Sequence, residues 1–202
     1  MNKVMSWIVL GLMTWGTIGS LGGSILIGRN YAYGKDSRDE AREWVEKFVP
    51  KGTNILIDMP HNCPRLQNTR EQMERFLESA VKTNNYKKEF WKLKLETLDP
   101  GATTYNIYVV QREFHEIGSI PQQVKDVQVT QDLIPITGEK KDFATLDKFK
   151  IRCIITNDTA LRAGGGAGDF YENLALSGIC WEFKLFEKTN LDGETIYIYL
   201  LG

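Results

Sequence analysis

The feature that most constrains this chain is an uncharged run near its start. Residues 4–28 contain no Asp, Glu, Lys or Arg, and Lys3 precedes them and Arg29 follows them. A helix needs about 20 apolar residues to cross the hydrocarbon core of a bilayer, because each residue advances it by about 1.5 Å. The run therefore predicts one transmembrane helix, and residues 1–35 are expected to form this helix and a short linker.

A cleaved secretory signal is the competing interpretation of the same run. Lys3 supplies a short basic start, and Gly22-Gly23-Ser24 offers small residues for cleavage. The run is longer than the roughly 7–15 apolar residues of a signal peptide, and it lacks an Ala-x-Ala-like end. These differences favour an uncleaved helix. Both interpretations place the rest of the chain outside the cytoplasm.

The charge of the remaining chain argues against nucleic acid as a partner. Residues 29–202 carry all 26 acidic residues and all but one of the 25 basic residues, a net charge of −2. A protein whose main partner is nucleic acid is usually basic. The chain is also 42% hydrophobic, which is too much for a disordered protein. We expect a charge-dense folded domain over residues 36–202, with the lipid bilayer as a partner through residues 4–28.

Alternating helix and strand patterns predict the fold of this domain. Ser37-Arg-Asp-Glu40 has the spacing of a capping box and precedes apolar residues at helical spacing. Further helices are expected from residue 68, near 86–98, over 142–148 and over 170–176, with a short helix start at 119–122. Strands are expected over 54–58, 104–110, 151–156, 181–186 and 195–201, and an extended or irregular segment over 127–137. This order predicts a single α/β layered domain with a mixed, largely parallel sheet that ends in an antiparallel hairpin.

Polar side chains follow two of the predicted strands. Asp58 and His61 come at the end of the first strand, and Asn157, Asp158 and Arg162 follow the strand over 151–156. Open α/β sheets bind ligands at the carboxyl ends of their strands. These five residues are therefore the predicted ligand-binding site.

The cysteines and histidines predict neither catalysis nor a metal site. Cys63 lies beside the predicted ligand site, but a nucleophilic cysteine needs a base and an oxyanion site, and the sequence identifies neither. The only histidine besides His61 is His115, far along the chain, so no metal ligand set is predicted. Cys153 and Cys180 lie in apolar runs and are expected to be buried, although one disulfide is an alternative in an exported domain. No catalytic residue and no cofactor is predicted.

Three other patterns have a structural and a functional interpretation. Asn157-Asp158-Thr159 is a glycosylation sequon, expected in an exposed loop at a strand end. The glycine-rich segment 163–168 departs from the phosphate-loop and dinucleotide patterns, which favours a flexible linker. Tyr197 and Tyr199 are expected on one face of the last strand, where they would pack under a helix or contact a glycan.

The residues from 36 to 55 resemble a known family. They run Asp36-Ser-Arg38-x-x-Ala41-x-x-Trp44-Val45-x-x-Phe48-Val49-Pro50-x-Gly52-x-x-Ile55. This order is similar to the C-terminal extracytoplasmic tail domain of multi-spanning glycosyltransferases that use polyprenyl-phosphate-linked sugars, the protein O-mannosyltransferase-like and lipid A aminoarabinose transferase-like enzymes. A later strand, a tyrosine-bearing helix and a closing hairpin extend the resemblance over about residues 5–202.

The resemblance implies an extracytoplasmic domain with a cytoplasmic N-terminus. Enzymes of the family place their catalytic acidic residues in a loop after the first of many spans, whereas this chain has one predicted span. Asp36, Asp39 and Glu40 belong to the first helix of the tail, so no catalytic residue is carried over. The resemblance thus implies an accessory domain or a fragment, in contact with a membrane glycosyltransferase or with a glycan or lipid-linked sugar.

Two alternatives come from the residues themselves. One is a small exported enzyme or ligand-binding domain that uses the strand ends at Asp58 and Asn157. The other is a structural membrane partner that self-associates through its span, because Gly19 and Gly23 have the spacing at which membrane helices pack closely.

Overall fold

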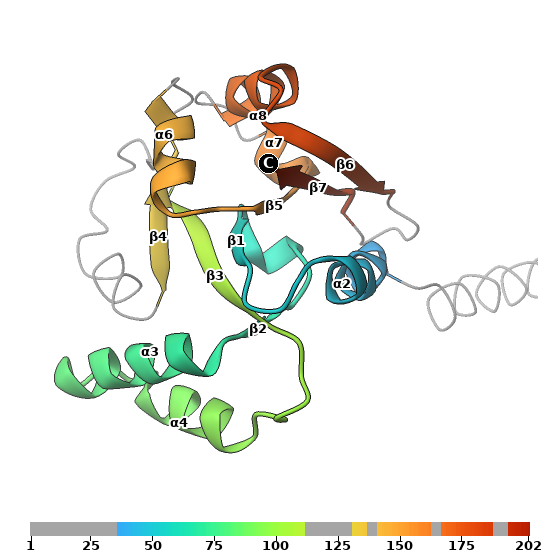
Figure 1. Cartoon of the computed structure of the whole chain (residues 1–202). Helices are drawn as coiled ribbons and strands as arrows, with labels where there is room; N and C mark the ends of the chain where they lie inside the picture. The colour runs from blue at the N-terminus through green and yellow to red at the C-terminus, as the bar shows by residue number, and fades with distance from the viewer. Residues whose placement is uncertain (1–35, 112–130, 137–140, 163–166, 188–193) are drawn as a thin grey trace, which may run out of the picture.

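Figure 1 shows the fold as a computed structural model, which describes residues 36–111, 131–136, 141–162, 167–187 and 194–202. The predicted span over 4–28 and the helix start at 119–122 lie outside these residues. Within the described ranges, no helix is long and apolar enough to cross a membrane.

A seven-stranded mixed sheet forms the centre of the domain (Figure 1). Its order is β2-β3-β1-β5-β7-β6, and β4 also pairs with β3. The strands are β1 (Asn54–Ile57), β2 (Gln67–Asn68), β3 (Thr104–Gln111), β4 (Asp132–Pro135), β5 (Cys153–Asn157), β6 (Cys180–Phe186) and β7 (Ile196–Leu201). All pairs are parallel except the two that β7 makes with β5 and β6. The predicted α/β domain with a largely parallel sheet and a closing antiparallel hairpin is confirmed.

Helices cover both faces of this sheet. They are α2 (Ser37–Phe48), α3 (Arg70–Lys82), α4 (Lys88–Glu96), α6 (Lys141–Lys148), α7 (Asp158–Arg162), α8 (Ala167–Leu176) and the 3-10 helix η1 (Pro60–Asn62). Ala41 and Val45 of α2 join the buried cluster on one face. Leu146 of α6 and Leu174 of α8 join the cluster on the other face. The α3–α4 pair has its own small core around Phe76 and Trp91, beside the sheet (Figure 1).

The last strand shows how side-chain alternation divides the two cores. Ile196 and Ile198 lie in the cluster that α2 covers, whereas Tyr197 and Tyr199 lie in the opposite cluster. The ring of Tyr199 stacks on Tyr171 of α8 with centroids 5.7 Å apart. The predicted alternation is confirmed, and Tyr199 packs under a helix.

The first helix begins with a different cap from the expected one. Asp36 is the N-cap, and its carboxylate accepts a hydrogen bond from the backbone N–H of Arg38. Ser37, the predicted cap, is already helical, and its hydroxyl donates to the carbonyl of Glu194 at 2.5 Å. Asp and Ser are both good caps. Here Ser37 instead joins the helix to the segment before β7.

The Asp36 cap makes stability depend on pH. Its hydrogen bonds and ion pair with Arg38 hold the pKa of Asp36 below the ordinary value of 3.8. A lowered native pKa stabilises the fold fully above the unfolded pKa, and the stabilisation disappears as pH falls through the native pKa. We expect Asp36→Ala to lower the free energy of unfolding by about 1 kcal/mol at pH 7 and by less below about pH 4. Urea unfolding at both pH values measures this difference.

Asp39→Ala is the matched control for this measurement. Asp39 lies in the same first turn, and its half-exposed carboxylate lies 3.4 Å from the Arg42 guanidinium. Its loss should cost less than about 0.5 kcal/mol. An Asp36→Ala effect that stays constant between pH 7 and pH 3 would contradict the role of the charged cap.

Candidate functional site

The parallel pairing of β1 and β5 brings the predicted site residues to one edge of the sheet. Ile57 lies opposite Ile155, and the N–H of Asp58 donates to the carbonyl of Ile155 at 2.9 Å. The side-chain amide of Asn157 donates to the carbonyl of Met59 at 3.3 Å. The two predicted strand ends are therefore neighbours.

Asp58 and Asn157 are nevertheless buried in hydrogen bonds within the fold. They are 1% and 0% exposed. The hydroxyl of Tyr171 in α8 donates to Asp58 Oδ2 at 2.8 Å. Asn157 Oδ1 accepts from the N–H of Ala160 at 2.9 Å and so caps α7. These contacts hold α7 and α8 against the strand ends, which is a structural role.

The burial of side chains at this edge of the sheet also tests two other predictions, the exposure of the sequon and the reactivity of Cys63. The sequon asparagine, Asn157, is fully buried, so the prediction that it lies in an exposed loop is wrong. Cys63 is buried as well and lies 3.4 Å from Asn157 Nδ2. Burial raises the pKa of the Cys63 thiol to about 12, so it stays protonated and unreactive at neutral pH. Cys63, Cys153 and Cys180 are all free, and none forms a disulfide.

The remaining predicted residues are closer to solvent. Asp158 starts α7, a helix that sequence patterns did not predict, and accepts a hydrogen bond from the Tyr197 hydroxyl at 2.7 Å. Arg162, whose side chain is 81% exposed, lies 3.7 Å from Asp158. His61 is exposed in η1 and makes no hydrogen bond to the other four among the described residues. The five residues therefore share one edge but do not converge on one point.

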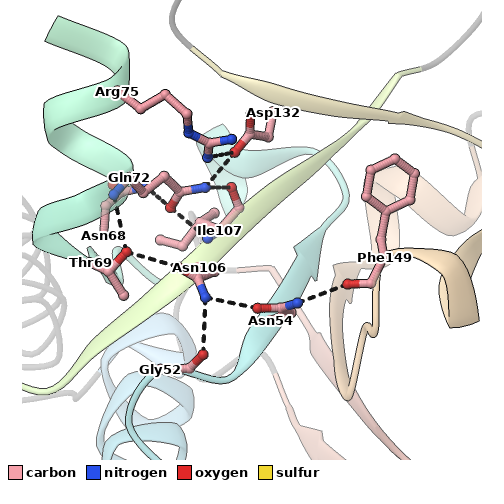
Figure 2. Close-up of polar contacts among 10 residues, drawn as sticks. All are labelled: Gly52, Asn54, Asn68, Thr69, Gln72, Arg75, Asn106, Ile107, Asp132 and Phe149. Atoms are coloured by element: carbon pink, nitrogen blue, oxygen red, sulfur yellow. Dashed lines mark hydrogen bonds and ion pairs between the residues drawn. The ribbon is translucent and has the colours of Figure 1, made fainter. Parts of the chain in front are cut away.

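A second polar cluster, which sequence analysis missed, lies along the outer edge of β3. Figure 2 shows the side chain of Gln72 from α3 placed against Ile107. Gln72 Oε1 accepts from the N–H of Ile107, and Nε2 donates to the carbonyl of the same residue, both at 2.8 Å. On this edge β2 pairs with β3 at residues 104 and 105, and β4 pairs from residue 108 onward. The amide of Gln72 thus completes the hydrogen bonding of β3 between two partner strands.

A chain of side-chain amides continues from this point across the sheet (Figure 2). The hydroxyl of Thr69, the N-cap of α3, donates to Asn106 Oδ1 at 2.8 Å. Asn106 Nδ2 donates to Asn54 Oδ1 at 2.8 Å, and Asn54 Nδ2 donates to the carbonyl of Phe149 at 2.8 Å. The chain links α3, β3, β1 and the end of α6.

Beside this chain the surface forms a hollow of about 380 Å³, which we call the β4 hollow. It is lined by Arg75, Tyr108, Gln111, Gln131, Asp132, Leu133 and Phe149. Asp132 Oδ2 accepts from Arg75 at 2.5 Å and from Gln72 Nε2 at 2.8 Å. The rings of Tyr108 and Phe149 lie 5.7 Å apart. Burial, then the Asp132 carboxylate, raises the pKa of Tyr108, so its hydroxyl remains a donor at neutral pH.

The two clusters differ in what they can do chemically. At the strand ends Asp58 and Asn157 are buried and hydrogen-bonded within the fold. The β4 hollow is lined by a carboxylate, a guanidinium, amides and two rings at the surface. Within the described residues, no group of three or more His, Cys, Asp or Glu side chains is arranged to hold a metal ion. Comparisons of the chain with family models, with curated proteins and with solved structures found no match.

Replacing Gln72 tests its contribution to the fold. Gln72→Ala leaves the N–H and the carbonyl of Ile107 without their side-chain partner at a site where Gln72 is only 2% exposed. We expect the free energy of unfolding to fall by about 2–3 kcal/mol. Gln72→Glu keeps the size but removes the donor to both the Ile107 carbonyl and Asp132, and it places a second carboxylate beside Asp132, so it should destabilise the fold similarly at pH 7. Glu78→Ala, an exposed change in the same helix, is the control and should cost under about 0.5 kcal/mol by urea unfolding.

Proposed function

We propose that this protein is a membrane-anchored extracytoplasmic α/β domain, related to the tails of polyprenyl-phosphate-sugar-dependent glycosyltransferases, which acts as an accessory without its own catalytic centre. The observation that carries this proposal is that the reactive groups at the strand ends are buried and hydrogen-bonded inside the fold. Asp58, Asn157 and Cys63 are buried and hydrogen-bonded to structural partners. A small exported enzyme acting at these strand ends has less support, because its reacting groups would have to be reached by substrate.

The position of the first helix supports the anchoring part of the proposal. Only residues 29–36 separate the uncharged run from α2. Eight extended residues span at most about 28 Å. Ser37 holds the start of α2 to the segment before β7. A run anchored in a bilayer would therefore keep the domain near the membrane surface.

The residues that carry the family resemblance also have clear places in the fold. Ala41 and Val45 are buried against the sheet, and Ile55 is buried in β1. Gly52 has a φ of +81°, in the left-handed region that favours glycine, at the turn between α2 and β1. In this fold the motif therefore corresponds to a helix–turn–strand unit.

Cysteine accessibility in cells tests the anchored orientation. Cys153 is fully buried and cannot report on topology, so exposed positions are needed. We expect Lys92→Cys, on the exposed surface of α4, to react with a membrane-impermeant maleimide in intact cells, in a background with Cys180→Ser. Asn2→Cys is the matched control and should react only after the membrane is permeabilised. Labelling of residue 2 and protection of residue 92 in intact cells would contradict the orientation.

A second candidate function is the binding of a sugar group in the β4 hollow. Carboxylate, guanidinium and amide groups together recognise hydroxyl groups, and aromatic rings pack on the apolar face of a sugar ring. Asp132 Oδ1 has no hydrogen bond among the described residues, and the Asp132 side chain is 22% exposed. The hollow volume lies within the range of small-molecule sites. Such binding would suit an accessory to glycosyl transfer.

Calorimetric titration with free monosaccharides, mannose and an amino sugar among them, tests the hollow in the full chain. We expect binding with Kd on the order of 1 mM, weakened at least about tenfold by Phe149→Ala. This change removes the ring but keeps the backbone carbonyl that Asn54 uses. Phe48→Ala, an exposed aromatic residue at the end of α2, should leave binding unchanged. Equal weakening by both variants would contradict a site in the hollow.

A further inference from the structure

Strand β6 lies at the margin of the sheet (Figure 1), and exposed apolar side chains occupy one of its faces. Trp181, Phe183 and Leu185 alternate along it and are 65%, 48% and 45% exposed. Isolated exposed apolar residues are common, but a row on one strand marks an interaction surface. This row continues the face that holds Tyr197 and Tyr199, because Phe183 lies opposite Tyr199 and Leu185 opposite Tyr197.

No strand pairs with the outer side of β6 in the part of the chain that the structure describes. Among the described residues β6 pairs with β7 alone, and it ends the strand order. Alternate residues of a strand direct their N–H and carbonyl groups to opposite neighbours. Half of the backbone groups of β6 therefore point away from β7. An exposed edge of this kind accepts a further strand.

The sequence of β6 is complementary to that of a second copy of the same strand placed antiparallel to it. Its central residues are Trp181-Glu182-Phe183-Lys184-Leu185. β6 pairs regularly with β7 over residues 182–186, and its register shifts between Cys180 and Glu182. An antiparallel partner with Phe183 opposite Phe183 brings Trp181, which lies in this shift, toward Leu185 of the other copy. The same register places Glu182 of each copy opposite Lys184 of the other. Apolar residues thus meet on one face of the pair and opposite charges meet on the other, and both arrangements stabilise antiparallel pairs.

The charged side chains are already on the face where this pairing needs them. Lys184 Nζ lies 3.0 Å from Glu182 Oε1 within one strand, and both side chains are partly exposed. On this face Lys184 Nζ also lies 5.9 Å from the ring centroid of Trp44 in α2. In the pair, each strand would contribute one acidic and one basic group to a cluster of four alternating charges.

We propose that β6 is a homodimer interface: a second copy of this chain adds its β6 antiparallel, in register at Phe183, so that the two sheets become continuous. The contact is isologous and closes with twofold symmetry, so it yields a dimer and not a fibre. The self-complementary charges select a second copy over an unrelated apolar strand. The proposal holds whether or not the chain is anchored in a membrane.

Charge reversal tests the register directly. Glu182→Lys and Lys184→Glu each create two like-charge pairs across the dimer, whereas the double variant restores both opposite-charge pairs. We expect each single variant to raise the dimer dissociation constant about tenfold or more, and the double variant to return to the parent value. Sedimentation equilibrium of the full chain in detergent measures the constant, and near-ultraviolet circular dichroism verifies that each variant is folded.

Mixing the two single variants gives a stronger test. Each variant resists pairing with itself, but the two are complementary to each other, so the mixture should form heterodimers as tightly as the parent forms homodimers. Energy transfer between differently labelled variants detects them. A monomeric parent, or single variants that dimerise like the parent, would overturn the proposal. Dimerisation abolished by Gly19→Leu with Gly23→Leu, yet insensitive to both charge reversals, would place the contact in the uncharged run and overturn it too.

Discussion

The side-chain amide of Gln72 supplies the hydrogen bonds that strand β3 would otherwise lack along part of its outer edge. Strand β3 needs partners along its outer edge, but β2 ends its pairing at Tyr105 and β4 begins its pairing at Tyr108. A buried backbone group without a partner costs about as much as a lost hydrogen bond. Gln72 supplies both a donor and an acceptor to Ile107 at this gap. The same amide reaches Asp132, so the α3–α4 pair, the start of β4 and the wall of the β4 hollow depend on one side chain.

Much of the fold could be predicted because its central strands are buried on both faces. Asn54–Ile57 and Cys153–Asn157 form short apolar runs that pattern analysis identifies directly, and the apolar spacing in α2 is equally clear. Strand β4 gave a weaker pattern, since its four residues begin with Asp132 and end with Pro135, and its pairing with β3 makes it a strand. Helix α7 was missed because its five residues look like a polar loop until Asn157 caps them.

The candidate sites depend on contacts between residues far apart in the sequence, which sequence patterns do not predict. The position of Asp58 after a strand was predicted, but its partner Tyr171 lies 113 residues further along the chain, in α8. Residue type and spacing do not reveal whether such a carboxylate faces solvent or the core. Sequence patterns could not predict the β4 hollow for a different reason. Arg75, Tyr108 and Asp132 come from three elements that share no local pattern and meet only when β4 joins the sheet.

The place of β7 in the sheet has a consequence for folding. It follows β6 along the chain, yet it lies between β5 and β6 and supplies both antiparallel pairings. Until β7 is inserted, β6 has no partner strand within the described ranges, and the edge of β5 that β7 occupies is open. β6 therefore joins the sheet only with or after β7, whereas β1, β3 and β5 can assemble earlier from parallel pairings of their own. Because β7 alone connects β6 to the parallel strands among the described residues, a change that weakens the pairing of β7 with β5 releases both strands of the hairpin together.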